Sequence, residues 1–145
     1  DRNIYAAAKG LAKGAYILAD AKPGKPDLIL IGTGSEVAIC VEAYETLKAE
    51  NVAVRVVSMP SWDLFEQQDQ TYRDSVFPPE VTARVSVEAG SVIGWDRYVG
   101  ASGTIIGMDT FGASAPIKAL MTQYGFTAEK VLAAARALLA KGTSR

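Results

Sequence analysis

The turn Gly32-Thr-Gly-Ser-Glu36 is the stretch whose residue types best suit chemistry, because it joins a run of apolar residues to an amphipathic segment. Glycines between a strand and a helix leave backbone N–H groups free to bind an anion. The turn begins like a dinucleotide-binding fingerprint, but Val37 stands where the third glycine belongs, and no acidic residue ends the following strand. We therefore favour a tight turn in which Ser35 caps a helix. An anion nest formed by Gly32, Thr33, Gly34 and Ser35 is the alternative.

Aromatic side chains gather in segments that follow the predicted strands. The loop Glu88-Ala-Gly-Ser-Val-Ile-Gly-Trp-Asp-Arg-Tyr98 holds two aromatics and three charges, and Met59-Pro-Ser-Trp62 and Asp109-Thr-Phe-Gly112 follow two other strands. The carboxyl ends of parallel strands share one edge of a sheet, where ligands and partners bind. We expect an exposed aromatic rim that binds a protein partner at this edge, formed by Trp62, Trp95, Tyr98 and Phe111. The alternative is that some of these rings cover the sheet as part of the core.

The chain contains no histidine, which excludes a Ser-His-Asp or Cys-His catalytic arrangement and any histidine-ligated metal site. The single cysteine, Cys40, excludes an internal disulfide and a multi-cysteine metal site. Its place on the apolar side of a predicted helix indicates a buried, unreactive side chain. General acid–base chemistry near neutral pH would then fall to carboxylates, lysines or tyrosines with strongly shifted pKa values.

Length and composition indicate one ordinary globular domain. The 145 residues are 49% apolar and 21% charged, which is typical of a chain with a packed core. Fifteen basic and sixteen acidic residues leave a formal charge of −1, whereas a nucleic-acid-binding domain usually has a basic excess. No apolar stretch approaches the roughly 20 residues that cross a bilayer. We expect no nucleic-acid or membrane partner. Because the first residue is Asp1 rather than Met, we also expect a fragment of a longer protein.

Alternating strand and helix patterns predict a three-layer α/β/α fold, in which helices cover both faces of an open, mostly parallel sheet. The predicted strands are residues 14–19, 27–31, 52–57, 81–88 and 103–108. Only the turn-forming residues Asp20 to Pro26 separate the first strand from the second. Since a parallel crossover needs a dozen or more residues, the first strand is expected to be antiparallel.

Helical periodicity begins after Gly34. The apolar stripe of this helix comprises Val37, Cys40, Val41, Tyr44 and Leu47. Two shorter helices are predicted, one beginning at Pro60 with the proline in its first turn, and one over residues 72–77.

Two further helices are predicted at the end of the sequence. Ser114 is the expected N-cap of the first, with Pro116 in its first turn. Its buried face is expected to comprise Ile117, Leu120, Met121 and Tyr124. Gly125 is expected to end this helix, Thr127 to cap the next, and Phe126 to pack against Val131. The inner face of the last helix then comprises Val131, Ala135 and Leu138.

An ordered series of motifs runs along the chain from Gly14 onward. The series comprises Ile31-Gly-Thr-Gly-Ser-Glu36, Arg55-Val-Val-Ser-Met-Pro-Ser61, Tyr72-Arg-Asp-Ser-Val76, Val81-Thr-Ala-Arg-Val-Ser-Val-Glu-Ala-Gly90, Trp95 to Gly100, Gly107-Met-Asp-Thr-Phe-Gly-Ala-Ser-Ala-Pro116 and Tyr124-Gly-Phe-Thr127. It resembles the C-terminal domain of the transketolase family. The resemblance implies a sheet of about five strands, one of them antiparallel. It also implies that residues 14–145 form a single domain, and that residues 1–13 are a linker from a preceding domain.

The resemblance further implies what the parent protein does. The family's enzymes are cytoplasmic homodimers of the pentose phosphate pathway that move a two-carbon ketol unit from a ketose phosphate to an aldose phosphate. They use thiamine diphosphate and a divalent metal, Mg or Ca, and the cofactor stabilises a carbanion. The family's catalytic groups, which include several histidines, lie in two preceding domains and have no matching positions here. The implied role of this chain is packing against those domains and assembling the dimer, and the isolated chain is expected to be inactive.

Two alternatives stay open at this point. The chain could be a stand-alone anion-binding or regulatory α/β module that uses the turn from Gly32 to Ser35. It could also be the equivalent domain of a related thiamine enzyme, such as a 2-oxoacid dehydrogenase β subunit or a deoxyxylulose-phosphate synthase. The segments Phe111–Pro116 and Met59–Ser61 favour transketolase over these relatives.

Overall fold

A computed structural model describes residues 3–142, so that residues 1–2 of the predicted linker and residues 143–145 of the predicted domain lie outside the described residues. Its strands are β1 (Tyr16–Asp20), β2 (Leu28–Gly32), β3 (Val54–Ser58), β4 (Arg84–Ser91) and β5 (Thr104–Met108). Its α-helices are α1 (Val37–Ala49), α2 (Trp62–Glu66), α3 (Gln70–Val76), α4 (Asp96–Val99), α5 (Ile117–Tyr124) and α6 (Ala128–Gly142). Two 3₁₀ turns, η1 (Ala8–Lys13) and η2 (Gly34–Glu36), precede β1 and α1.

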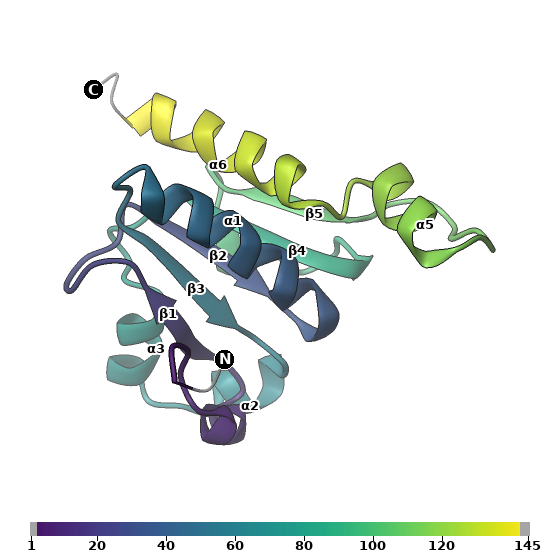
Figure 1. Ribbon diagram of the computed structural model, residues 1–145. Coiled ribbons are helices and arrows are strands. Elements are labelled where there is room, and N and C mark those ends of the chain that lie inside the picture. Colours follow the sequence, from purple (N-terminus) through teal and green to yellow (C-terminus); the bar gives the residue numbers. More distant parts are fainter. Residues whose placement is uncertain (1–2, 143–145) are drawn as a thin grey trace.

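The five strands form one sheet in the order β1-β3-β2-β4-β5 (Figure 1). β1 pairs with β3 in the antiparallel direction, and the other three pairs are parallel. The short turn after β1 explains this direction, because it cannot span the length of the sheet. The predicted α/β fold with an antiparallel first strand is confirmed.

Two apolar cores lie on the two faces of the sheet, because successive strand side chains point to opposite sides. In β2, Leu28 and Leu30 pack in the core that α1 and α6 cover, whereas Ile29 and Ile31 pack in the core on the other side. The second core includes apolar side chains of α2, α3 and α4. Every residue of β2 and β3 is buried, as expected for central strands covered on both faces.

The long helices bury most of the predicted stripes, although Val37 and Val41 of α1 are only half-buried. Cys40, Tyr44 and Leu47 of α1 are buried, and so are Val131, Ala135 and Leu138 of α6. Gly125 ends α5 in the left-handed conformation, with φ 78° and ψ 21°. The Thr127 hydroxyl accepts a hydrogen bond from the Lys130 backbone N–H at 3.3 Å, as an N-cap does.

The starts of three helices differ from the predictions. α3 begins at Gln70 rather than at residue 72, with Asp69 as its N-cap. α2 begins at Trp62 with Ser61 as its N-cap, so Pro60 lies before the helix rather than in its first turn. α5 begins at Ile117, and Ser114 is not its cap, because Pro116 occupies the N-cap position in an extended conformation (ψ 136°). A residue that precedes proline is disfavoured in the helical region, so Ala115 and Ser114 stay outside the helix.

The predicted apolar face of α5 is only partly buried. Met121 and Tyr124 pack against the core, whereas Ile117 at the start of the helix is exposed. α5 projects past the end of α6 and covers little of the sheet (Figure 1). Residues 109–119, which connect β5 to α5 and form its first turn, are all exposed.

The parallel strands β2, β3, β4 and β5 all end at one edge of the sheet, here called the carboxyl edge. Tyr16, the first residue of β1, pairs with Ser58, the last residue of β3, so the chain also enters β1 at this edge. β2 lies between β3 and β4, which makes its carboxyl end the point where the strand order reverses. Within residues 3–142, no helix is long and apolar enough to span a membrane.

Candidate functional site

The turn from Gly32 to Ser35 lies at the carboxyl edge, directly after β2. A Cβ atom at Gly32 would lie 2.8 Å from the Val37 Cα and 3.1 Å from the Cys40 Sγ, so only glycine allows α1 to approach so closely. Ser35 does not cap the helix, contrary to the prediction. Its hydroxyl instead donates a hydrogen bond to Oε1 of Glu36 at 2.6 Å.

Glu36 changes the electrostatics of this turn. Its side chain is buried and lies at the beginning of α1, where partial positive charge from the helix dipole favours a carboxylate. A second anion would meet the negative charge of Glu36 at close range. The anion nest therefore stays a prediction, and Glu36 is the residue that opposes it.

A cavity of about 340 Å³ opens beside this turn at the reversal point of the strand order. Its lining comes from the ends of β2, β3 and β4 and the loops after them, and comprises Thr33, Met59, Pro60, Trp62, Glu88, Ser91, Ile93 and Trp95. Glu88 is the charged residue in this lining, and its Oε2 accepts a hydrogen bond from the Trp95 Nε1–H at 2.6 Å. The cavity thus combines indole rings with a carboxylate, a lining that suits a cationic or neutral group better than a phosphate.

The predicted aromatic rim is wrong for two of its four members. Trp95 and Tyr98 are only 1% and 4% exposed, and they belong to the core below the sheet. The Trp62 and Trp95 rings meet edge to face at 5.1 Å, and Tyr98 lies 5.4 Å from Trp62, measured between ring centroids. The short helix α4 folds these rings back over the sheet instead of presenting them to solvent. Trp62 is half-buried, and Phe111 is the one member that is fully exposed, at 98%.

Phe111 forms one wall of a second hollow at the same edge. This hollow, of about 660 Å³, is lined by Ser91, Val92, Ile93, Met108, Asp109, Thr110 and Phe111. It shares Ser91 and Ile93 with the smaller cavity, so the two hollows adjoin each other at this edge. Ile93 is 82% exposed.

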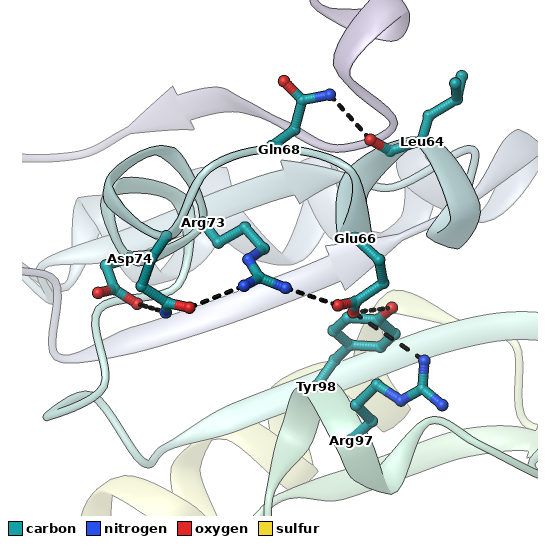
Figure 2. Close-up of polar contacts among 8 residues, drawn as sticks. Leu64, Glu66, Gln68, Arg73, Asp74, Arg97 and Tyr98 are labelled. Atoms are coloured by element: carbon teal, nitrogen blue, oxygen red, sulfur yellow. Dashed lines mark hydrogen bonds and ion pairs between the residues drawn. The ribbon is translucent and has the colours of Figure 1, made fainter.

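Glu66 at the end of α2 joins three helices through its carboxylate (Figure 2). Oε1 accepts a hydrogen bond from the Tyr98 hydroxyl at 2.8 Å, and Oε2 accepts one from Nη1 of Arg73 at 2.8 Å. Nη1 of Arg97 lies 4.0 Å from the same carboxylate. Burial of Tyr98 is the main cause that raises the pKa of its hydroxyl to about 12, and its hydrogen bond to Glu66 is the second cause. Tyr98 is therefore neutral at physiological pH, and the cluster ties α2, α3 and α4 together.

The remaining groups offer little for catalysis. Burial raises the pKa of the Cys40 thiol to about 12, so the reactive thiolate is scarce at neutral pH. Among residues 3–142, no group of three or more His, Cys, Asp or Glu side chains could hold a metal ion.

Sequence reasoning singled out the turn, Trp62 and Phe111 but missed the polar partners at this edge. In the sequence, Glu88 is simply one residue of an aromatic-rich loop, and Glu36 is the last residue of the glycine-containing turn. Glu66 gave no signal, because a glutamate at the end of a short helix is ordinarily a solvated residue. Glu66 acquires its role from a contact between distant segments, because its partner Tyr98 lies 32 residues further along the chain.

Comparisons with known proteins agree with this architecture. The sequence model of one family, described as the Transketolase-like TK C-terminal domain, matches residues 14–127. The chain is 52% identical over 133 residues to Transketolase of Geobacillus stearothermophilus, which covers 92% of this chain and 20% of that protein. It is 55% identical over 129 residues to Transketolase 1 of Escherichia coli (strain K12), which covers 89% of this chain and 19% of that protein. The chain therefore spans about a fifth of the length of the curated relatives it matches.

Solved structures show the same fold. Transketolase from Leishmania mexicana superposes with a TM-score of 0.84 at 40% identity, over 92% of this chain and 19% of that chain. Transketolase from Campylobacter jejuni gives a TM-score of 0.71 at 28% identity, over 84% of this chain and 18% of that chain.

Proposed function

Because the chain belongs to the family of transketolase C-terminal domains, we propose that it is the C-terminal, non-catalytic domain of a transketolase. The observation that carries the proposal is identity above 50% to two transketolases along about nine tenths of the chain. The parent enzyme would move a two-carbon ketol unit from a ketose phosphate to an aldose phosphate in the pentose phosphate pathway.

The parent would use thiamine diphosphate, which stabilises the carbanion formed during this transfer, together with a divalent metal, Mg or Ca. The residues of this chain do not fit that cofactor. The turn at the start of α1 already holds the Glu36 carboxylate, and the adjacent cavity presents Glu88, so both places repel a diphosphate. We therefore assign no catalytic step to the residues of this chain. Sugar phosphates and cofactor would bind to the preceding domains.

The role proposed for the chain itself is packing against the preceding domains and helping to assemble a homodimer. Residues 14–145 would form the domain and residues 1–13 the linker that leads into it, and the family match supports this boundary by beginning at residue 14.

We propose that the parent works in the cytoplasm. Some relatives are named chloroplastic, as the transketolase of Zea mays is, so location differs within the family.

An assay of the full-length parent tests this function directly. With thiamine diphosphate and Mg²⁺, the parent should transfer a ketol unit between sugar phosphates, and a parent that transfers none would refute the proposal. A parent active only on 2-oxoacids, or one that forms deoxyxylulose phosphate, would instead assign the chain to a related thiamine enzyme. A gene that encodes no upstream domain would favour the stand-alone module.

A further inference from the structure

The carboxyl edge carries an apolar surface that remains exposed in this chain. We propose that this surface, formed by Ile93 and by the exposed segment 109–119 that carries Phe111 and Ile117, and here called the docking surface, packs against the preceding domain of the same parent chain. The proposal rests on the proposed function, because it needs a parent in which other domains precede this one.

The exposure of the docking surface is unusual for side chains of this size. Phe111, Ile93 and Ile117 are 98%, 82% and 69% exposed, more than the other exposed large apolar side chains. Soluble surfaces that expose several large apolar side chains together usually mark a binding site. Phe111 and Ile117 belong to the exposed segment 109–119, whose charged residues are Asp109 and Lys118.

Hydrogen bonds hold two of these residues in place. The Tyr124 hydroxyl donates to the Phe111 backbone carbonyl at 3.2 Å, which ties the exposed loop to the end of α5. The Ile93 backbone N–H donates to the Ser91 hydroxyl at 3.2 Å. A surface whose anchors are already positioned loses less entropy when a partner binds. The ring of Phe111 is thus presented outward by a loop that one hydrogen bond joins to α5.

Charge complements the apolar character of this edge. The larger hollow, between Ile93 and Phe111, contains Asp109, and the adjoining cavity contains Glu88. Neither lining includes a lysine or arginine, and within residues 3–142 neither carboxylate has a salt bridge. The matching segment of the preceding domain should therefore supply apolar side chains and at least one basic side chain.

The point at which the chain enters this domain indicates that the preceding domain is the one that binds the docking surface. η1 leads into β1 at the carboxyl edge, and it is fixed there because the Ser61 backbone N–H donates to the Gly14 carbonyl at 3.0 Å. In the relatives about four fifths of the chain lies outside the matching part, and a C-terminal domain has that remainder before it. β1 and β5 are four strand spacings apart, about 19 Å, less than the roughly 30 Å diameter of a small domain. A domain attached through η1 can therefore reach the docking surface.

Hydrogen exchange of the full-length parent tests this contact. We expect the backbone amides of residues 109–119 to exchange at least about ten-fold more slowly in the parent than in the isolated chain. This protection should not depend on protein concentration, because the contact lies within one chain. Equal exchange rates in the two proteins would overturn the proposal. Protection that is lost when the parent is diluted to monomers would assign the surface to a second subunit, which also overturns it.

A pair of variants makes the test independent of the isolated chain. Phe111→Asp in the parent should restore fast exchange in residues 109–119, whereas the control Ala137→Asp, on the exposed face of α6, should leave exchange there unchanged. A Phe111→Asp parent with full protection would contradict the proposal. The result is separable from the proposed function, because a parent without ketol-transfer activity refutes that function and leaves the exchange comparison readable.

Discussion

At the scale of single residues, Trp95 and Phe111 are two aromatic side chains that were expected to be exposed and that differ in their exposed fraction. Both follow a strand at the carboxyl edge, yet Trp95 is 1% exposed and Phe111 is 98% exposed. Trp95→Ala should lower the free energy of unfolding of the isolated chain by about 3–5 kcal/mol, because it opens a cavity in the core. Phe111→Ala should change it by less than about 0.5 kcal/mol. Urea denaturation of both variants measures the difference, and equal losses would contradict the assigned positions.

The buried hydroxyl of Tyr98 should make stability depend on pH in the alkaline range. Its pKa is about 12 in the folded chain and 10.0 in a free side chain, so folding favours the protonated form. The stabilisation is complete below pH 10, and it is lost as pH rises from 10 toward 12, on the order of 2 kcal/mol in all. Denaturation from pH 9 to 11 should show a steeper loss for the wild type than for Tyr98→Phe. Parallel curves would argue against the raised pKa.

The turn at Gly32 offers a charge-based test of the anion nest. Phosphate should shift the backbone amide resonances of Gly34 and Ser35 only weakly, because Glu36 opposes a second negative charge. Glu36→Gln should bind phosphate more tightly, by about 1 kcal/mol or less for a partly screened charge. An NMR titration compares the two proteins. If phosphate moves neither resonance even in Glu36→Gln, the turn is not an anion site.

The residue types alone could not decide these cases. A large aromatic side chain in a loop is equally compatible with a core and with an interface, since both bury it in the end. Trp95 is buried because α4 folds onto Trp62 and Glu88, which are distant from each other in the sequence. Cys40 was predictable, because it stands on a helical stripe whose spacing alone places it inward.

At the scale of elements, Arg84 at the start of β4 joins several segments through backbone carbonyls. Its Nε–H donates to Val81 at 2.7 Å, and its two Nη groups donate to Tyr98 at 2.8 Å, Pro78 at 2.8 Å and Phe77 at 3.4 Å. Arg84→Met should lower the free energy of unfolding by about 2–4 kcal/mol, because the Val81, Phe77 and Tyr98 carbonyls each lose the Arg84 donor.

The control for Arg84 is an arginine whose side chain is exposed. Arg136 of α6 forms a surface ion pair with Glu50, and Arg136→Met should cost less than about 1 kcal/mol. Thermal denaturation of both variants provides the comparison. Similar effects of the two substitutions would show that Arg84 does not join these segments.

Elements were predicted best where a local rule decided them. The length of the turn after β1 fixed its antiparallel direction, and helical spacing located α1 and α6. The predicted start of α5, with Ser114 as N-cap and Pro116 in the first turn, is wrong. The extended conformation of Pro116 excludes Ser114 from the helix. The exposure of Ile117 could not be predicted, because it depends on where α5 lies relative to the sheet.

At the scale of the whole molecule, two well-packed cores coexist with an edge where the described residues 3–142 form no group of three or more His, Cys, Asp or Glu side chains that could hold a metal ion. The sequence has no histidine, and the carboxyl edge presents carboxylates, indole rings and exposed apolar side chains. Such an edge suits contact with another domain better than binding of a phosphorylated cofactor. We therefore propose that this chain folds and docks, while the preceding domains of the parent perform the chemistry.

Calorimetric titration of the isolated chain with thiamine diphosphate and Mg²⁺ tests that claim most directly. The cavity at the carboxyl edge has no lysine or arginine to hold a diphosphate, and residues 3–142 have no cluster of three or more His, Cys, Asp or Glu side chains to hold its Mg²⁺, so we predict no heat of binding up to roughly millimolar cofactor. The chain should meanwhile unfold in a single cooperative transition whose midpoint the cofactor does not change. Saturable binding with a micromolar dissociation constant would contradict the account.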